Sequence, residues 1–195
     1  MSNREEIQHS VLIVSGSEKF DALMKRTLPP ASLMSVEFKR NAAAARRCIL
    51  ERYYDIVVVN TPLPDESGVE FTIDTADQCS ASILIVVPSE SYINVLARVT
   101  DRGVLALSKP FPQVQISYAV RFLMAQRVKI YRLEKKARSA EEKAEEIKLI
   151  DKAKFLLIEN RYMTEDEAHR FIGKQAMDNG LSRKRMAQQI IEDFE

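Results

Sequence analysis

The sequence predicts an α/β fold with a doubly wound, five-stranded parallel sheet, followed by a long coiled-coil helix and a small three-helix unit. Short runs of β-branched apolar residues alternate with helix-length segments five times before residue 112. Continuous apolar runs of this kind fit strands that are covered on both faces, as in a parallel sheet. After that point, residues 113–160 contain neither proline nor glycine, and Ala, Glu, Lys, Leu and Arg dominate, which predicts one long helix.

The expected strands and helices of the first part follow one another regularly. The apolar runs that predict buried strands are 11–14, 56–59, 83–87 and 104–107. A weaker alternating run at 32–38 suits an edge strand. The helices expected between these strands cover about 18–28, 41–52, 67–79 and 90–101, and a fifth is expected to begin at Phe111.

Composition limits the classes of protein to consider. The chain has 195 residues, of which 46% are hydrophobic, so it can bury a core. Its net charge of +1 means that a polyanion must be met by a local basic patch. Cys48 and Cys79 lack metal or redox spacing and predict a reducing, cytoplasmic location. We expect no membrane span, no metal, no cofactor and no enzymatic activity, since neither apolar runs nor catalytic motifs of the required kind occur.

The long helix carries apolar residues at alternating spacings of four and three, which is typical of a coiled coil. The core positions that we expect to join two parallel chains are Ile116, Leu123, Ile130, Leu133, Ala137 and Ala140. The flanking pairs Lys129 with Glu134 and Lys136 with Glu141 have opposite sign in a parallel dimer. We therefore predict a parallel homodimer through residues 112–147. The alternative is a single helix packed on its own α/β domain.

The last third of the chain predicts two further helices. Thr164 and Glu167 form a capping box that opens the first, Asn179-Gly180 closes it, and Ser182 caps the second. Apolar residues line one face of each helix and are expected to pack on the end of the long helix. The members of this expected core are Ala153, Leu156, Leu157, Ile158, Ala168, Phe171, Ile172, Ala176, Leu181, Met186, Ile190 and Phe194.

Residues 9–112 resemble the receiver domain of response regulators, which has a flavodoxin-like fold. The resemblance rests on the fivefold strand and helix order, on Leu63-Pro64 with Gly68 after the third strand, and on Lys109-Pro110-Phe111 after the fifth. It implies a Mg²⁺ site built from acidic residues, and an aspartate that accepts phosphate at the end of the third strand.

The positions that would hold this phosphorylation chemistry carry the wrong residues. Ser15 and Gly16 stand where the metal-binding acids are expected, Asn60 stands at the phosphoacceptor position, and Val87-Pro88 replaces the hydroxyl residue. Only Lys109 remains of the set, either as a partly solvated amine or paired with Glu18 or Asp65. We predict a receiver domain that cannot be phosphorylated on aspartate. It could serve as a dimerisation or docking scaffold, or its emptied pocket could bind another ligand.

Residues 147–191 resemble the ANTAR domain of transcription antiterminators. The matching pieces are 150–154 with Leu156-Leu157, then 163–169, 174–177, and Met186-Ala187 with Ile190-Ile191. One departure is Gly173, because many ANTAR domains have arginine there. The resemblance implies a dimer that binds paired stem-loops of a leader RNA and thereby prevents a terminator hairpin from forming. The expected domains are therefore 1–111, 112–147 and 148–195.

Cations, stacking rings and side-chain amides are the groups that RNA loops require. The candidate RNA-binding residues are Lys152, Lys154, Arg161, Tyr162, His169, Arg170, Lys174, Gln175, Arg183, Lys184, Arg185 and Gln188. Each has a simpler interpretation: the run 183–185 could be a solvated helix start, Tyr162 could belong to the core, and His169 could be an ordinary surface residue.

Two other functions fit the same pattern. Receiver domains commonly precede helical DNA-binding units, so the chain could be a DNA-binding response-regulator-like transcription factor. It could also be a protein-interaction scaffold without a nucleic-acid partner. The sequence names neither the target RNA nor the signal, which could come from a regulatory partner protein or a small ligand.

Overall fold

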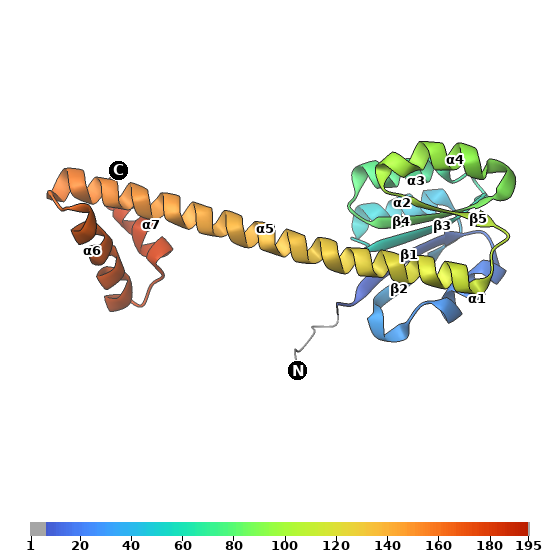
Figure 1. Ribbon diagram of the computed structural model, residues 1–195, viewed down its shortest axis with the longest axis horizontal. Helices are drawn as coiled ribbons and strands as arrows, with labels where there is room; N and C mark the ends of the chain where they lie inside the picture. Colours follow the sequence, from blue (N-terminus) through green and yellow to red (C-terminus); the bar gives the residue numbers. More distant parts are fainter. Residues whose placement is uncertain (1–6, 195) are drawn as a thin grey trace. The chain divides into compact units, whose positions relative to one another are not determined.

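The computed structural model describes residues 7–194 and divides the chain into two compact units (Figure 1). The division falls between Tyr131 and Arg132, within a single continuous helix. We call the part before the division the receiver-like domain and the part after it the C-terminal unit.

The receiver-like domain is built on a five-stranded sheet, as predicted. Its strands are β1 (His9–Ser15), β2 (Leu33–Lys39), β3 (Ile56–Asn60), β4 (Ser82–Pro88) and β5 (Leu105–Lys109). All neighbouring strands pair in parallel, in the order β2-β1-β3-β4-β5, so the weak run 32–38 does form an edge strand. The carboxyl ends of β1, β3 and β5 therefore meet at the same edge of the sheet.

Helices cover both faces of the sheet (Figure 1), which confirms the doubly wound fold. They are α1 (Glu18–Thr27), α2 (Ala42–Glu51), α3 (Val69–Gln78), α4 (Tyr92–Val99) and α5 (Gln113–Arg161). Residues of α1 and α5 pack with Val11, Ile13 and Val58 on one face, and residues of α2, α3 and α4 pack with Leu12 and Val57 on the other. The central strands β1, β3 and β4 are thus apolar on both sides, because each side meets a helix.

The helix α5 corrects two predictions. It begins at Gln113 and not at Phe111, because Pro112 disfavours a helical backbone in the residue that precedes it. Ile116 and Leu123 are 0% and 1% exposed in the core of the receiver-like domain, so they cannot form a seam with a second chain. The same apolar spacing serves packing on a sheet and packing in a coiled coil. The alternative of a helix packed on its own domain therefore holds for this part of α5.

The C-terminal unit joins the end of α5 to α6 (Glu165–Asp178) and α7 (Arg183–Phe194), as the sequence predicts. The capping box of Thr164 and Glu167 is present, and Asn179 ends α6 before Gly180, which has a φ of +65°. The predicted core residues pack together except Ile158, which is 36% exposed. Leu149 and Ile150 contact that core instead, because the helix turns this face toward α6 and α7.

Candidate nucleic-acid interface and the altered receiver site

The carboxyl edge of the sheet brings together Ser15, Asn60 and Lys109, as the receiver resemblance implies. Ser15 and Asn60 are aligned in the register of β1 and β3, and both are buried. The amide Nδ2 of Asn60 donates a hydrogen bond of 2.9 Å to the Oγ of Ser15, while its Oδ1 has no protein partner. An amide and a hydroxyl therefore occupy the positions where a nucleophilic carboxylate and a metal-binding acid would be needed.

Lys109 pairs with neither of the acids that the sequence suggested. Its Nζ donates to the main-chain oxygen of Thr61, and burial lowers the pKa of its ammonium group. Glu18 instead accepts from Arg40 at 3.0 Å, and Asp65 accepts from backbone amides of α2. The lysine thus holds the loop after β3 in place through a carbonyl.

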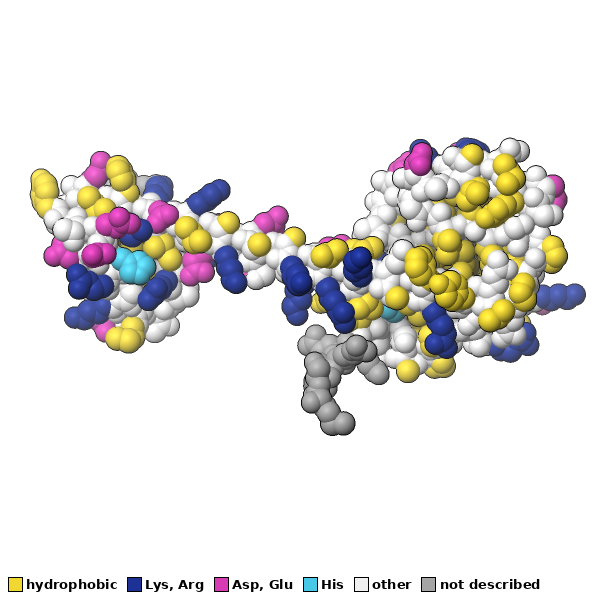
Figure 2. Space-filling model, viewed as in Figure 1, with side chains coloured by type: hydrophobic (Ala, Val, Ile, Leu, Met, Phe, Trp, Pro, Cys, Tyr) yellow, Lys and Arg dark blue, Asp and Glu magenta, His cyan; other side chains and the backbone are white. Residues whose placement is uncertain are grey.

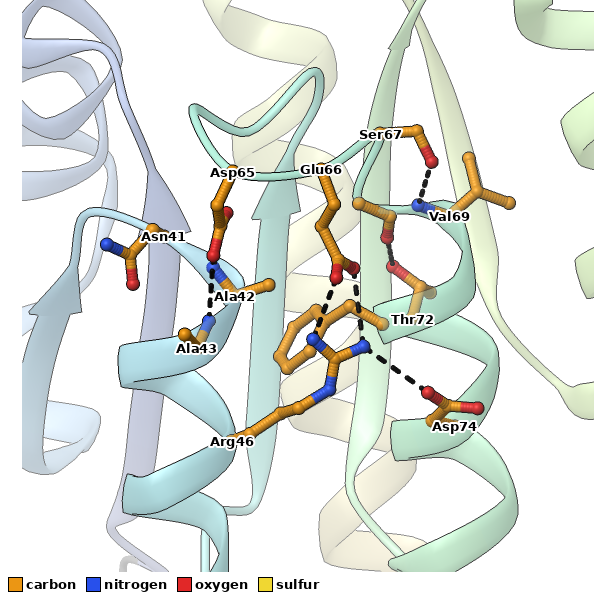
Figure 3. Close-up of polar contacts among 12 residues, drawn as sticks. Asn41, Ala42, Ala43, Arg46, Asp65, Glu66, Ser67, Val69, Thr72 and Asp74 are labelled. Carbon is orange, nitrogen blue, oxygen red and sulfur yellow. Dashed lines mark hydrogen bonds and ion pairs between the residues drawn. The ribbon is translucent and has the colours of Figure 1, made fainter.

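Contacts with α2 and α3 fix the β3–α3 loop (Figure 3). The carboxylate of Asp65 accepts from the amides of Ala42 and Ala43, each at 3.0 Å, and these bonds lower its pKa. Arg46 of α2 bridges Glu66 at 2.8 Å and Asp74 at 3.3 Å. The acids of this loop are therefore used as helix caps and ion pairs.

Two other positions also differ from what the usual receiver chemistry requires. A Cβ on Gly16 would lie 2.8 Å from the Cγ of Pro64, so an acidic side chain there would displace the loop. Pro88 ends β4 beside Lys109 and carries no hydroxyl. The hydroxyl of the next residue, Ser89, donates to Glu90 at 3.4 Å. Among the described residues, no group of three or more His, Cys, Asp and Glu could hold a metal ion.

An open groove lies on the C-terminal unit, between the turn that ends α5 and the exposed face of α6. Its volume is about 500 Å³. The lining residues, which define what we call the basic groove, are Arg161, Tyr162, Met163, Glu167, Arg170, Phe171 and Lys174. Arg170 and Lys174 share one face of α6 because they are one helical turn apart. Four of the seven lining residues are candidates that the sequence had singled out.

The three cations of the basic groove form no ion pair with any carboxylate in the described part of the chain. The guanidinium of Arg161 lies over the rings of Phe171 and Phe194, at 5.3 and 5.7 Å from their centres. Arg170 donates from Nε to the main-chain oxygen of Asp166, which leaves its terminal nitrogens exposed. Glu167 accepts from the amide and hydroxyl of Thr164, which lowers the pKa of that carboxyl.

Tyr162 is not a core residue, so one of the two interpretations of it was wrong. Its side chain is 93% exposed, and its φ of +55° places the backbone in the left-handed region. Helices commonly end on such a residue, but glycine or asparagine usually fills the position. The turn therefore holds an aromatic ring in solvent at the edge of the basic groove.

The remaining candidates differ in exposure, and two of the lysines form ion pairs with carboxylates. Lys154 contacts Asp151 at 2.8 Å and Glu165 at 3.0 Å, and Lys184 contacts Glu145 at 2.5 Å. These carboxylates raise the pKa of each lysine and neutralise its charge locally. The run 183–185 therefore does not act as one cationic cluster. The candidates that are exposed outside the groove are Lys152, His169, Arg183 and Arg185, while Gln175 and Gln188 are half-buried.

The lining residues Met163, Glu167 and Phe171 were not identified as functional from the sequence. Met163 and Phe171 line the groove, although Phe171 was expected only as a core residue. The side chain of Arg183 lies against Gly173, with its Nη2 3.5 Å from the place of an added Cβ, which is an ordinary contact distance. This cation from α7 thus lies against α6 at the residue that precedes Lys174. Figure 2 shows side chains of both signs on the visible face of the C-terminal unit, so attraction of a polyanion depends on local placement.

The fold and the sites define a receiver-like α/β domain joined by a long helix to a small helical unit with a basic groove. The ANTAR domain family matches residues 138–191. The transcriptional regulatory protein PdtaR of Mycobacterium tuberculosis, from strains CDC 1551 / Oshkosh and ATCC 25618 / H37Rv, is 30% identical over 139 residues. These residues cover 71% of this chain and 67% of PdtaR.

Solved structures resemble the first part of the chain. A signal receiver domain of an HD domain-containing protein from Pseudomonas fluorescens Pf-5 matches with a TM-score of 0.57 and 18% identity, over 68% of this chain and 97% of that one. A CheY-like response regulator receiver domain from Methanospirillum hungatei JF-1 matches with a TM-score of 0.55 and 15% identity, over 63% and 98%. At these identities the likeness shows the receiver fold alone.

The chain belongs to the ANTAR response regulators, which are transcription regulators that combine a receiver-like domain with an ANTAR domain. The resemblances to receiver and ANTAR domains that the sequence suggested are thereby confirmed. Within residues 7–194, no helix is both long and apolar enough to cross a membrane.

Proposed function

We propose that this protein is an RNA-binding transcription antitermination regulator that acts as a dimer on paired hairpins of a leader RNA. The observation that carries the proposal is the basic groove, where three cations that form no ion pair within residues 7–194 lie beside an exposed aromatic ring. Cations bind phosphates, and an exposed ring offers a stacking surface for a base.

RNA loops suit this groove better than a duplex does. The deep groove of an RNA helix hides its base edges, so proteins that read RNA sequence do so in loops where bases are unstacked. A groove of about 500 Å³ is of the size that binds one small molecular unit rather than a whole duplex. The neighbouring exposed cations Arg183 and Arg185 can contact the phosphates of the flanking stem.

Dimerisation would present two such grooves at once. Ile130 and Leu133 are 36% and 56% exposed on α5, as expected for apolar side chains that meet a second chain. Two C-terminal units in one dimer would bind two hairpins of the same RNA, and binding of the second becomes intramolecular. By analogy with the ANTAR family, bound hairpins exclude the overlapping terminator hairpin, and transcription continues.

In our proposal, the receiver-like domain contributes to this function without being phosphorylated on aspartate. Three observations support a role without phosphorylation. Asn60 carries an amide, positions 15 and 16 hold serine and glycine in place of acids, and Asp65 holds the β3–α3 loop against α2. Control of the protein then depends on a partner protein, a ligand or its concentration.

A gel-shift assay with a two-hairpin leader RNA tests the RNA-binding proposal. The double variant Arg170→Ala, Lys174→Ala should weaken binding at least tenfold and reduce the slope of log affinity against log salt by about 2. The matched control is the double variant Arg132→Ala, Lys135→Ala, which removes two exposed cations of α5 outside the groove and should have a smaller effect.

Three outcomes would contradict the proposal. Binding that does not depend on salt would exclude phosphate contacts, and tighter binding to duplex DNA than to the hairpins would favour a DNA-binding regulator. Failure to bind any nucleic acid, together with capture of a defined protein partner, would favour a scaffold.

A further inference from the structure

Tyr162 combines two features that a purely structural residue would avoid. Within the described residues it is the only one other than glycine with a positive φ. Its side chain is also 93% exposed, so burial of the ring gives the fold almost nothing in return. A left-handed backbone is unfavourable for residues with a Cβ. Glycine, which has no Cβ, would relieve the strain at this position. Such strain concentrates at functional sites.

The surroundings of Tyr162 indicate what the ring could bind. The turn holds the ring at the edge of the basic groove, whose other members include Arg161, Arg170 and Lys174. Arg161 is fixed over two phenylalanine rings, and this contact keeps its guanidinium near the turn. A flat, exposed ring beside fixed positive charges complements a flat base attached to a phosphate.

We propose that Tyr162 is the stacking platform for one unpaired base of the RNA loop, and that the basic groove holds the phosphate of that nucleotide. This inference rests on the proposed RNA-binding function and names the part of the RNA that the site recognises. An unpaired base has both faces free, whereas a paired base is already stacked within its helix. The platform therefore selects a loop nucleotide over the stem.

A single substitution separates the cost of the strained backbone from the use of the ring. Tyr162→Gly removes the ring and relieves the left-handed backbone. We expect its thermal unfolding midpoint to rise by about 4 °C. Its affinity for the hairpin RNA should fall by about tenfold or more, which is typical of the loss of one stacked base. Tyr162→Phe keeps both properties and should resemble the wild type in both measurements.

Changing the RNA completes the experiment. In RNAs that carry an abasic nucleotide at each loop position in turn, one position should lower wild-type affinity while Tyr162→Gly binds that RNA as well as the wild type does. Phe155→Ala is the matched control, because it removes another exposed aromatic side chain of the C-terminal unit, 57% exposed, that does not line the groove. It should retain the sensitivity to the same abasic position.

The outcomes distinguish this inference from the function on which it rests. If the wild type binds no hairpin RNA, the proposed function fails. If the wild type binds and Tyr162→Gly binds equally well, RNA binding stands and the stacking role is wrong. A lower unfolding midpoint for Tyr162→Gly would show that the left-handed backbone carries no cost, which would also overturn the inference.

Discussion

Asn60 illustrates how one side chain changes the chemistry that a receiver fold can support. The strand order and the position of Lys109 bring the same groups together as the receiver resemblance implies. An amide, however, cannot attack a phosphorus atom as a carboxylate does, and it bonds to Ser15 in place of a metal ion. A Cβ at position 16 would lie 2.8 Å from the Cγ of Pro64, so an acidic residue there would require the loop to shift.

Incubation with acetyl phosphate and Mg²⁺ should leave the mass of the protein unchanged. Asn60→Asp should also remain unmodified, because Ser15 and Gly16 supply no carboxylate for the metal. Intact mass spectrometry checks both forms, with a phosphorylatable receiver domain as the positive control. A phosphate adduct on the wild-type protein would refute this prediction.

In the helix α5, one apolar period serves both packing on the sheet and the predicted packing against a second chain. Between Ile116 and Met124, the buried apolar residues of α5 pack in the receiver-like domain, and Arg127, further along the helix, is 3% exposed. The guanidinium of Arg127 donates to the main-chain oxygen of Ser80 at 3.0 Å and to the hydroxyl of Tyr53, and lies 3.6 Å from Asp55. These contacts fix α5 to the segments that lead into β3 and β4.

Arg127→Ala should lower the free energy of unfolding of the receiver-like domain by about 3 kcal/mol, because it removes the cation paired with Asp55 and the side-chain donor to the Ser80 carbonyl. Urea denaturation of the full chain followed by circular dichroism measures the change. Arg121→Ala, on the exposed side of the same helix, should change it by less than about 0.5 kcal/mol. Equal effects of the two substitutions would show that the Arg127 contacts do not anchor the helix.

At the scale of the whole molecule, the proposed function requires two chains. The predicted dimer seam is reduced to Ile130, Leu133, Ala137 and Ala140, since Ile116 and Leu123 are buried in their own domain. A seam with alanine at two of these positions buries little apolar area, so we expect a dimer of modest stability.

Leu133→Glu should convert the dimer into a monomer, because it places a charge of the same sign from each chain in the seam. Sedimentation equilibrium at micromolar concentration measures the association. Lys135→Glu changes the charge on the outer side of the same heptad and should leave the dimer intact. If the wild type is already monomeric, or if Lys135→Glu dissociates it equally, the predicted seam is wrong.

The sequence by itself determined the features that depend on neighbouring residues. Strand runs, the capping box of Thr164 and Glu167, and the helix end at Gly180 are encoded locally and were predicted correctly. The replacement of the phosphoacceptor by Asn60 was also readable, because its position follows directly from the end of a strand.

Only the tertiary structure decided which surfaces these elements turn toward one another. The heptad could not show that Ile116 and Leu123 face the sheet, because the same spacing suits both partners. The basic run 183–185 could not show that Lys184 is neutralised by Glu145, which lies 39 residues earlier in the chain. The exposure of Tyr162 was likewise undecided until the turn was placed, since burial depends on packing between distant segments and not on local sequence.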